Sequence, residues 1–217
     1  MVEIIPAILT SDIREIQEKI AVAEEVVKRV QIDIIDGQFA QNKTVDPSAI
    51  EVVDTEIQLD FHLMTKEPID WVERSARGGA DRIIGQIEMM SDQVAFLGKV
   101  QELGLSVGLA IDLKTEISSL DATILGNVDV ILVMAVEAGF GGQKFDPKVL
   151  AKINKLAKIR AKGGARFRIC VDGGETENTV DETRFSGADE IVVGARIFQG
   201  DLAENIKKFE EAAHNGR

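Results

Sequence analysis

Val130-Ile131-Leu132-Val133-Met134-Ala135-Val136 is the longest uninterrupted apolar run in the chain. Its apolar residues are continuous and do not alternate with polar ones, which is typical of a strand buried on both faces of a parallel sheet. The run is also far shorter than the roughly 18 residues of a membrane-spanning helix. This run belongs to a slightly longer stretch, Val128–Val136, which is one of eight runs rich in β-branched residues. The eight runs predict eight strands: Ile4–Leu9, Gln31–Asp36, Ile57–Met64, Ala80–Glu88, Ser106–Asp112, Val128–Val136, Arg166–Asp172 and Glu190–Gly194.

Charged segments with helical spacing separate these runs. Apolar residues recur every three or four positions from Ile13 to Val27 and from Val149 to Ile159. Capping residues or first-turn prolines precede several segments, at Ser11–Asp12, Asp46–Pro47 and Asp146–Pro147. Eight strand–helix units in 217 residues predict a (β/α)8 TIM barrel, and no linker divides the chain, so we expect one domain over residues 1–217. An open doubly wound sheet, usually of fewer strands, is the alternative architecture.

The composition excludes several classes of protein. The chain is 45% hydrophobic, and 25 Lys and Arg residues stand against 37 Asp and Glu residues, a net charge of −12. A chain of this length and apolar content buries a core and is not disordered. One cysteine, Cys170, cannot build a disulfide scaffold. The acidic charge disfavours nucleic acid and membranes as partners. Without a signal-peptide pattern, we expect a soluble, cytoplasmic protein.

Polar residues at the ends of the predicted strands suggest chemistry, because barrel enzymes react at the carboxyl ends of their strands. Asp33 and Asp172 lie on the second and seventh strands, so they can face each other across the barrel mouth. Such a pair can remove a proton from one face of a carbon and deliver one to the other face, which inverts a centre next to a carbonyl. With His62 they also offer ligands for a divalent metal, which would stabilise an enediolate. Any one aspartate is more simply a helix cap, but the three residues together favour function.

Three glycine clusters follow the last three predicted strands. Their backbone amides can approach a phosphate closely, and the loops after strands seven and eight commonly hold phosphate in barrels. The clusters predict a phosphate site that needs no basic patch, and they comprise Gly139, Gly141 and Gly142, then Gly173 and Gly174, then Gly194 with Ala195.

At these residues the chain resembles the ribulose-phosphate 3-epimerase family. The matching segments occur in order and span nearly the whole chain: Asp33-Ile34-Ile35-Asp36-Gly37-Gln38-Phe39 with Asn42 and Thr44, Asp60-Phe61-His62-Leu63-Met64, Gly139-Phe140-Gly141-Gly142-Gln143-Lys144-Phe145, Val171-Asp172-Gly173-Gly174, and Gly187-Ala188-Asp189 leading to Gly194 and Ile197-Phe198.

The resemblance implies a barrel that moves a proton on a phosphorylated ketose through an enediolate, in a homo-oligomer. Asp33 and Asp172 would be the catalytic acid and base. Asp33, His62 and Asp172 would bind a divalent metal (Zn, Fe, Mn or Co). The substrate-binding residues would be His62, Met64, Met134, Gly139, Gly141, Gly142, Gly173, Gly174, Gly194 and Ala195.

The chain also departs from the pattern of that family. Gln31 stands where a fourth metal ligand, histidine, is usual, so metal binding would be weakened, shifted towards harder ions or lost. Ala7 and Ala195 replace serines that would contact the substrate, and Gln86 replaces a histidine. Ile35 and Ala138 replace a methionine and a proline.

Three hypotheses follow. The first is an epimerase that inverts C3 of D-ribulose 5-phosphate to give D-xylulose 5-phosphate, or that acts on a close analogue. The second is a catalytically impaired homologue that binds a phosphosugar, which the changes at Gln31, Ala7 and Ala195 would suit. The third is a decarboxylase of a related barrel. Such enzymes use an Asp-x-Lys-x-x-Asp array, whereas this chain has His62 and Thr65 at the last two positions, which disfavours that reading.

Overall fold

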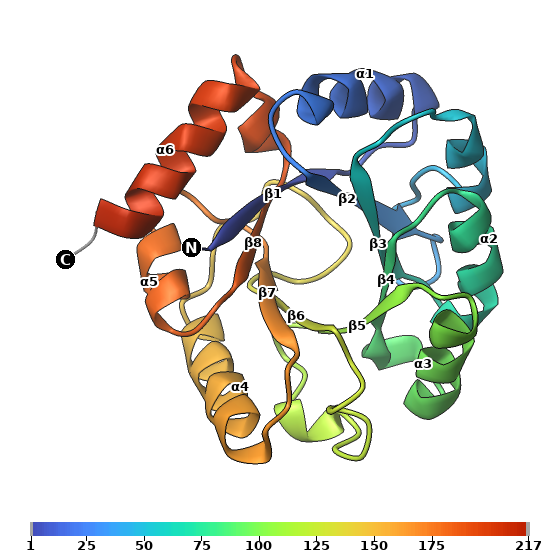
Figure 1. Ribbon diagram of the computed structural model, residues 1–217, viewed down its shortest axis with the longest axis vertical. Helices are drawn as coiled ribbons and strands as arrows, with labels where there is room; N and C mark the ends of the chain where they lie inside the picture. The colour runs from blue at the N-terminus through green and yellow to red at the C-terminus, as the bar shows by residue number, and fades with distance from the viewer. Residues whose placement is uncertain (1, 216–217) are drawn as a thin grey trace.

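Eight parallel strands close into a barrel in the computed structural model, which describes residues 2–215 (Figure 1). Neighbouring strands pair in chain order, and the last pairs with the first. Each strand lies within two residues of a predicted run, which confirms the barrel and not the open sheet. The strands are β1 (Glu3–Ile8), β2 (Arg29–Ile35), β3 (Gln58–Met64), β4 (Arg82–Gln86), β5 (Ser106–Ile111), β6 (Val130–Met134), β7 (Arg168–Asp172) and β8 (Glu190–Val193).

Helices surround the barrel, but not after every strand (Figure 1). They are α1 (Ile13–Glu24), α2 (Val72–Arg77), α3 (Gln93–Glu102), α4 (Val149–Gly163), α5 (Val180–Phe185) and α6 (Leu202–Asn215). Short 3-10 turns supplement them: η1 (Pro47–Val52), η2 (Pro68–Trp71), η3 (Ile87–Met89), η4 (Ile117–Ser119) and η5 (Ala195–Phe198). Within the part of the chain that is described, no helix is long and apolar enough to cross a membrane.

The prediction of a helix in every unit is wrong at two connections. Between β2 and β3, and between β5 and β6, residues 2–215 contain only the turns η1 and η4. In η1, Pro47 and Ile50 are the buried residues, so the segment offers no apolar stripe long enough to hold an α-helix against the barrel.

The predicted helix starts are correct in part. Asp12 caps α1 by accepting a hydrogen bond from the Arg14 backbone N–H at 2.9 Å. Asp146 does not cap α4, which begins at Val149. Its carboxylate accepts from the Lys148 N–H at 2.9 Å and closes the turn before the helix.

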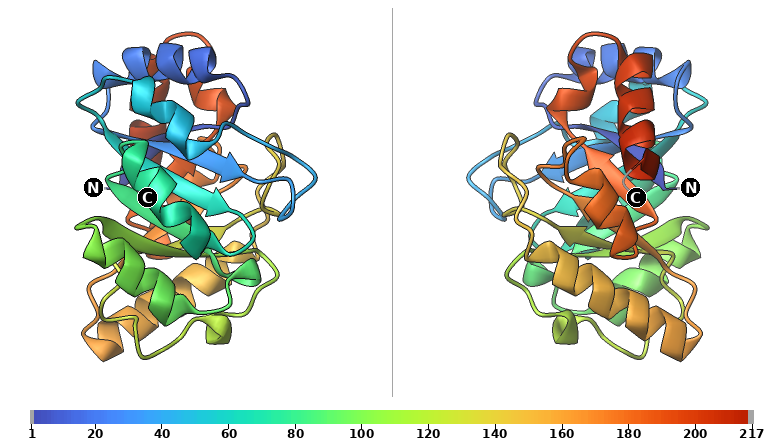
Figure 2. Two further views of the ribbon diagram at one scale, coloured as in Figure 1. Left: turned by 90° about the vertical axis from the view of Figure 1, so that its right-hand side faces the viewer. Right: turned by 90° about the vertical axis from the view of Figure 1, so that its left-hand side faces the viewer.

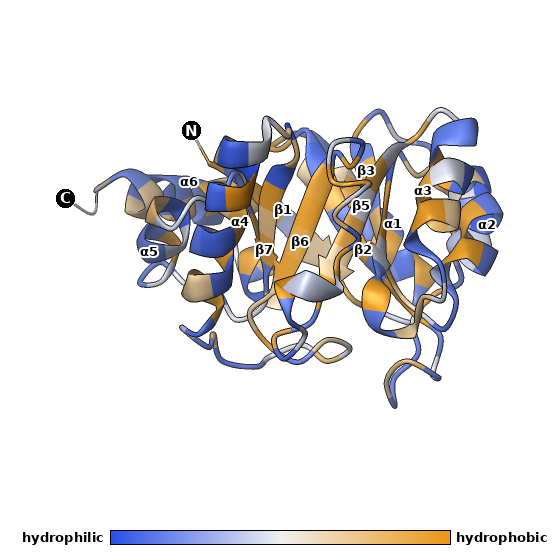
Figure 3. Cartoon of the chain, turned by 90° about the horizontal axis from the view of Figure 1, so that it is seen from below, coloured by the Kyte–Doolittle hydropathy of each residue, from blue (hydrophilic) through white to orange (hydrophobic). Residues whose placement is uncertain are grey.

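The barrel strands separate two apolar cores. The larger core lies between strands and helices and includes Phe61 and Leu63, and the smaller fills the barrel interior and includes Ile35, Met64 and Leu132. Figure 3 shows the apolar strands inside and the hydrophilic faces of the helices outside. Because side chains of a strand alternate between its two faces, His62 shares the interior with Met64. The sequence pattern alone allows either Asp60, His62 and Met64 or Phe61 and Leu63 to point inward, and the structure selects the first set.

A buried ionic cluster closes the opposite end of the barrel. Arg82 donates to both carboxylate oxygens of Glu190, at 2.9 and 2.7 Å, and also pairs with Asp60. Burial raises the pKa of Asp60 to about 6, although Arg82 and Arg29 oppose the shift. Asp60 therefore belongs to the floor of the barrel and not to the site at its mouth.

Two loops rise from the mouth of the barrel. Figure 2 shows the loop after β2 beside the loop after β6, at one end of the molecule. Asn42 in the first loop donates a hydrogen bond to the Gly139 carbonyl in the second, at 3.0 Å. This contact holds the first glycine cluster over the strand ends.

Candidate active site

A cavity of about 220 Å³ lies at the carboxyl ends of the strands. Nearly all the predicted site residues line this cavity, although they are far apart in the sequence. The predicted residues that line it are Asp33, Met64, Met134, Gly139, Gly141, Gly142, Asp172, Gly173, Gly174, Gly194 and Ala195. Of the predicted set, His62 is completely buried and does not line the cavity, although it contacts the two aspartates that do.

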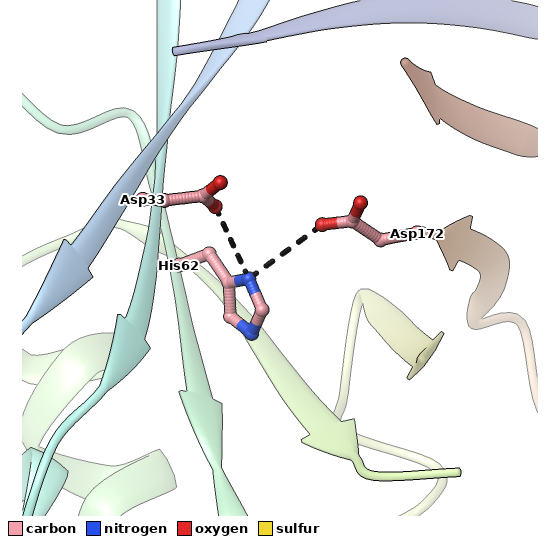
Figure 4. Close-up of side chains that lie close together, drawn as sticks. All are labelled: Asp33, His62 and Asp172. Atoms are coloured by element: carbon pink, nitrogen blue, oxygen red, sulfur yellow. Dashed lines mark ion pairs between the residues drawn. The ribbon is translucent and has the colours of Figure 1, made fainter. Parts of the chain in front are cut away.

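The two aspartates and the histidine converge from three strands (Figure 4). Asp33 and His62 are register partners on β2 and β3, and Asp172 ends β7. His62 Nδ1 lies 3.3 Å from an oxygen of Asp33 and 3.8 Å from an oxygen of Asp172. Asp33 and Asp172 are 8% and 9% exposed, so their carboxylates reach the cavity from an otherwise buried setting.

Gln31 bridges the two aspartates. Its side-chain nitrogen donates to Asp33 Oδ1 at 2.9 Å and to Asp172 Oδ2 at 2.7 Å. A carboxamide nitrogen carries two protons, so it can serve both carboxylates at once. Gln31 therefore holds the pair together and shields part of their mutual repulsion.

Gln86 fixes the far side of the imidazole. His62 Nε2 lies 3.0 Å from Gln86 Oε1, and a carbonyl oxygen can only accept, so Nε2 carries a proton. Nδ1 is then left facing the two carboxylates, without a well-formed hydrogen bond among the described residues. Burial lowers the pKa of His62, but the negative charges of Asp33 and Asp172 beside the ring more than offset this effect, so the pKa is raised.

These residues fit a divalent metal with three protein ligands. One donor atom each of Asp33, His62 and Asp172 lies within 4.8 Å of the others. The orphaned Nδ1 of His62 points into the cluster, as a ligating nitrogen would. Gln31 presents its nitrogen to the carboxylates, and only a turned amide would offer its oxygen as a fourth ligand.

The two carboxylates also perturb each other. Burial and the nearby charge of Asp33 raise the pKa of Asp172 to about 7, against the opposing effects of His62 and Gln31. Two carboxyl groups sharing one buried site resist carrying two negative charges together. Burial and the charge of Asp33 therefore favour the protonated form of Asp172.

The glycine loops come close to other backbone around the cavity. Gly174 has a φ of +68°, and a Cβ atom there would lie 2.2 Å from the Phe145 backbone nitrogen. Any side chain at this position would force the β6 and β7 loops apart. Glycine therefore leaves only backbone atoms at this point of the cavity wall.

Comparison with known proteins agrees with this geometry. The family model described as the ribulose-phosphate 3-epimerase family matches residues 3–198. The chain belongs to the ribulose-phosphate 3-epimerase family. A ribulose-phosphate 3-epimerase of Synechocystis sp. is 35% identical to this family member over 198 residues, covering 89% of this chain and 86% of that protein. The ribulose-phosphate 3-epimerase of Bacillus subtilis is 30% identical over 214 residues, covering 96% and 98%.

Solved structures share the fold of this epimerase-family chain at low sequence identity. KGPDC from Streptococcus mutans has a TM-score of 0.74 and 14% identity, and the match covers 99% of this chain and 98% of the other. The 3-hexulose-6-phosphate synthase from Salmonella typhimurium has a TM-score of 0.65 and 17% identity over all of both chains. At these identities the likeness concerns the barrel alone.

Sequence reasoning missed Glu175, a buried acid next to the second glycine cluster of this epimerase-family chain. It follows Gly174 directly and is 3% exposed. Its carboxyl group accepts hydrogen bonds from the hydroxyls of Thr179 and Thr183, at 2.6 and 2.7 Å. Burial raises the pKa of Glu175 to about 7, although both hydroxyls oppose the shift. A charged residue beside a glycine pair gives no sequence signal that distinguishes a buried acid from a solvated one.

We expect Glu175 to make folding stability depend on pH. Its pKa is raised in the folded state, so its contribution to stability is complete below the unfolded pKa and is lost as the pH rises through about 7. Glu175→Gln mimics the protonated acid at every pH. From pH 5 to pH 8, the free energy of unfolding of the Glu175→Gln variant should therefore fall by about 2 kcal/mol less than that of the parent protein. Urea denaturation at both pH values measures this, and equal pH dependence of the two proteins would contradict it.

The cavity lining contains a residue that the sequence did not single out. Lys19, on α1, lines the cavity that Gly194 and Ala195 also line. It lies in a Lys- and Glu-rich helical stretch, where a lysine is most simply interpreted as part of the solvated outer face. Only the packing of α1 against the segment after β8 reveals its position.

Proposed function

We propose that this protein interconverts the C3 epimers of a phosphorylated ketose, D-ribulose 5-phosphate and D-xylulose 5-phosphate or a close analogue. The observation that carries the proposal is the pair Asp33 and Asp172, brought from opposite parts of the chain to one cavity with their carboxylates linked by Gln31. A protein that only binds a phosphosugar has no chemical need for two adjacent acids of this kind. Membership of the epimerase family supports the same conclusion.

In the proposed reaction, one aspartate removes the proton from C3 and the other returns a proton to the opposite face. For one direction, ionised Asp33 acts as the base while protonated Asp172 acts as the acid, and the reverse direction exchanges the two roles. The raised pKa of Asp172 suits it to hold the proton that it delivers as the acid. Each turnover leaves the protonation of the pair reversed, and proton exchange with solvent restores it.

The remaining cavity residues would orient the sugar and protect the intermediate. Met64 and Met134 present apolar surface beside the aspartates and would exclude water from the enediolate. The backbone amides of Gly174, Gly194 and Ala195 would hold the phosphate, since these residues also line the cavity. A divalent ion held by Asp33, His62 and Asp172 would add positive charge beside the enediolate oxygens. Asp33 and Asp172 themselves carry out the proton transfers.

The direct test is conversion of D-ribulose 5-phosphate by the purified protein, followed by ¹³C NMR, with and without added Mn²⁺, Zn²⁺ or Fe²⁺. We expect D-xylulose 5-phosphate to accumulate until the two epimers reach equilibrium. Binding of the sugar phosphate without conversion under every metal condition would reject the epimerase and favour the impaired phosphosugar-binding homologue. An unchanged sugar phosphate affinity in Asp172→Asn would then confirm that Asp172 has no role in that protein.

A further inference from the structure

We propose that Lys19 binds the phosphate group of the substrate and supplies the positive charge at that end of the cavity. This inference rests on the proposed function, because it assigns a ligand to the phosphate end of the same site. The charges that line the cavity support this role. Among residues 2–215, the cavity lining contains the carboxylates of Asp33 and Asp172 and a single cationic side chain, that of Lys19. A phosphate dianion entering an acidic protein is repelled unless a local positive group opposes that field.

The position of Lys19 in the fold also supports this role. Figure 1 shows α1 beside the segment that follows β8, and the Lys19 ammonium lies 5.1 Å from the centre of the Phe198 ring. Phe198 ends η5, and Ala195, the first residue of η5, lines the cavity with Gly194. The ammonium is therefore held against the same short segment whose backbone forms the predicted phosphate cradle.

Contacts within the protein orient the Lys19 ammonium before any substrate binds. Lys19 Nζ lies 2.5 Å from Glu15 Oε1, and the other oxygen of Glu15 accepts from the Thr10 hydroxyl at 2.5 Å. Thr10 follows β1, so this chain of contacts ties the lysine to the barrel mouth. An ammonium has three N–H donors, and Glu15 takes one of them. The side chain is only 20% exposed, so the other donors lie in a sheltered setting where a charged hydrogen bond to phosphate is strong.

The predicted phosphate site also needs a side-chain donor. Ala195 carries no hydroxyl, so at this position the cradle offers the phosphate a backbone N–H alone. A lysine reaching the same wall supplies the missing side-chain donor. Lys19 acts here as a substrate-binding residue, which predicts an effect on KM and phosphate affinity and little effect on proton transfer at Asp33 and Asp172.

The test is the dissociation constant of inorganic phosphate, measured by isothermal titration calorimetry on the intact protein. Lys19→Met is expected to weaken phosphate binding by about tenfold or more, while Lys19→Arg stays within about threefold of the parent. Lys208→Met is the matched control, because Lys208 also pairs with a glutamate four residues before it, Glu204, and this pair lies on the exposed face of α6. It should bind phosphate as the parent does.

A double variant separates attraction by the lysine from repulsion by its abandoned partner. If Lys19→Met acts only by leaving Glu15 unpaired, Glu15→Gln/Lys19→Met will recover parental phosphate affinity, which would overturn the proposal. We expect the double variant to stay weak. Unchanged affinity in Lys19→Met, or no phosphate binding by the parent, would also overturn it. Phosphate binding is measured without turnover, so the two proposals can fail separately. If the parent is an active epimerase and Lys19→Met keeps the parental phosphate affinity, only the role of Lys19 is rejected. If phosphate binding depends on Lys19 but the parent does not epimerise the sugar phosphate, only the proposed function is rejected.

Discussion

Asp172→Asn is expected to lower kcat for epimerisation by about a thousandfold, with KM changed much less. An amide cannot accept or deliver the proton that the second face of C3 requires, and a positioned acid or base contributes effects of about this size. The fold should persist, because asparagine keeps the shape of the side chain and can still bond to Gln31. Steady-state kinetics with both epimers, together with circular dichroism, measure the two parts of this expectation.

Asp33→Asn sharpens the same prediction. Each single variant retains one acid, which can remove and return a proton on its own face without inversion. We therefore expect each variant to exchange the C3 hydrogen of one epimer with solvent, and the two variants to exchange opposite epimers. Asp12→Asn, at the exposed cap of α1, is the control and should keep parental activity. If both variants exchange the same epimer, or either one still epimerises at the parental rate, the division of roles between the two aspartates is wrong.

Gln31→His should convert a weak metal site into a strong one. In the parent, a metal must displace two hydrogen bonds from Gln31 and gains at most an amide oxygen, which suits Zn²⁺ less well than imidazole does. The variant removes the amide and adds a fourth ligand of the preferred kind. We expect parental protein to retain well under one Zn²⁺ per chain after desalting, and the variant to retain about one, with at least tenfold higher affinity. Elemental analysis and competition with a chromophoric chelator measure both quantities.

Gln17→His is the control for this metal prediction, because Gln17 is exposed on α1 and makes no contact with the site. It should retain no more Zn²⁺ than the parent. Full occupancy of the parent at an affinity equal to that of Gln31→His would show that Gln31 yields its place to the metal without loss. The glutamine would then be a competent ligand, and the weakening expected from the sequence would be wrong.

The sequence predicted the barrel well because each strand is buried on both faces. Such strands are continuous apolar runs, and all eight were visible as in Val130–Met134. The helices were less certain. The β2–β3 connection begins with a proper cap and proline, Asp46 and Pro47, yet it forms only a 3-10 turn because its apolar stripe is too short. Local capping signals start a helix, but packing against the barrel decides whether it continues.

The site divides in the same way. The gathering of Asp33, Asp172 and the glycines around one cavity was predictable because they lie near or just after the ends of strands, and a barrel gathers strand ends at one face. The orientation of His62 was not, since a strand buried on both faces does not reveal which alternate side chains point inward. The bridging amide of Gln31 depends on the distance between two strands that are far apart in the sequence. Lys19 and Glu175 depend on helix packing and burial, which the pattern of charged residues does not report.

The most direct test of the account follows deuterium at C3. The protein is incubated with D-ribulose 5-phosphate in D₂O, and both epimers are examined by ¹H NMR and mass spectrometry. The account predicts that D-xylulose 5-phosphate forms carrying one deuterium at C3, and that a variant lacking both Asp33 and Asp172 gives neither product nor exchange. Product that retains the original C3 hydrogen, or a parent protein that incorporates no deuterium, would contradict proton transfer by the two aspartates.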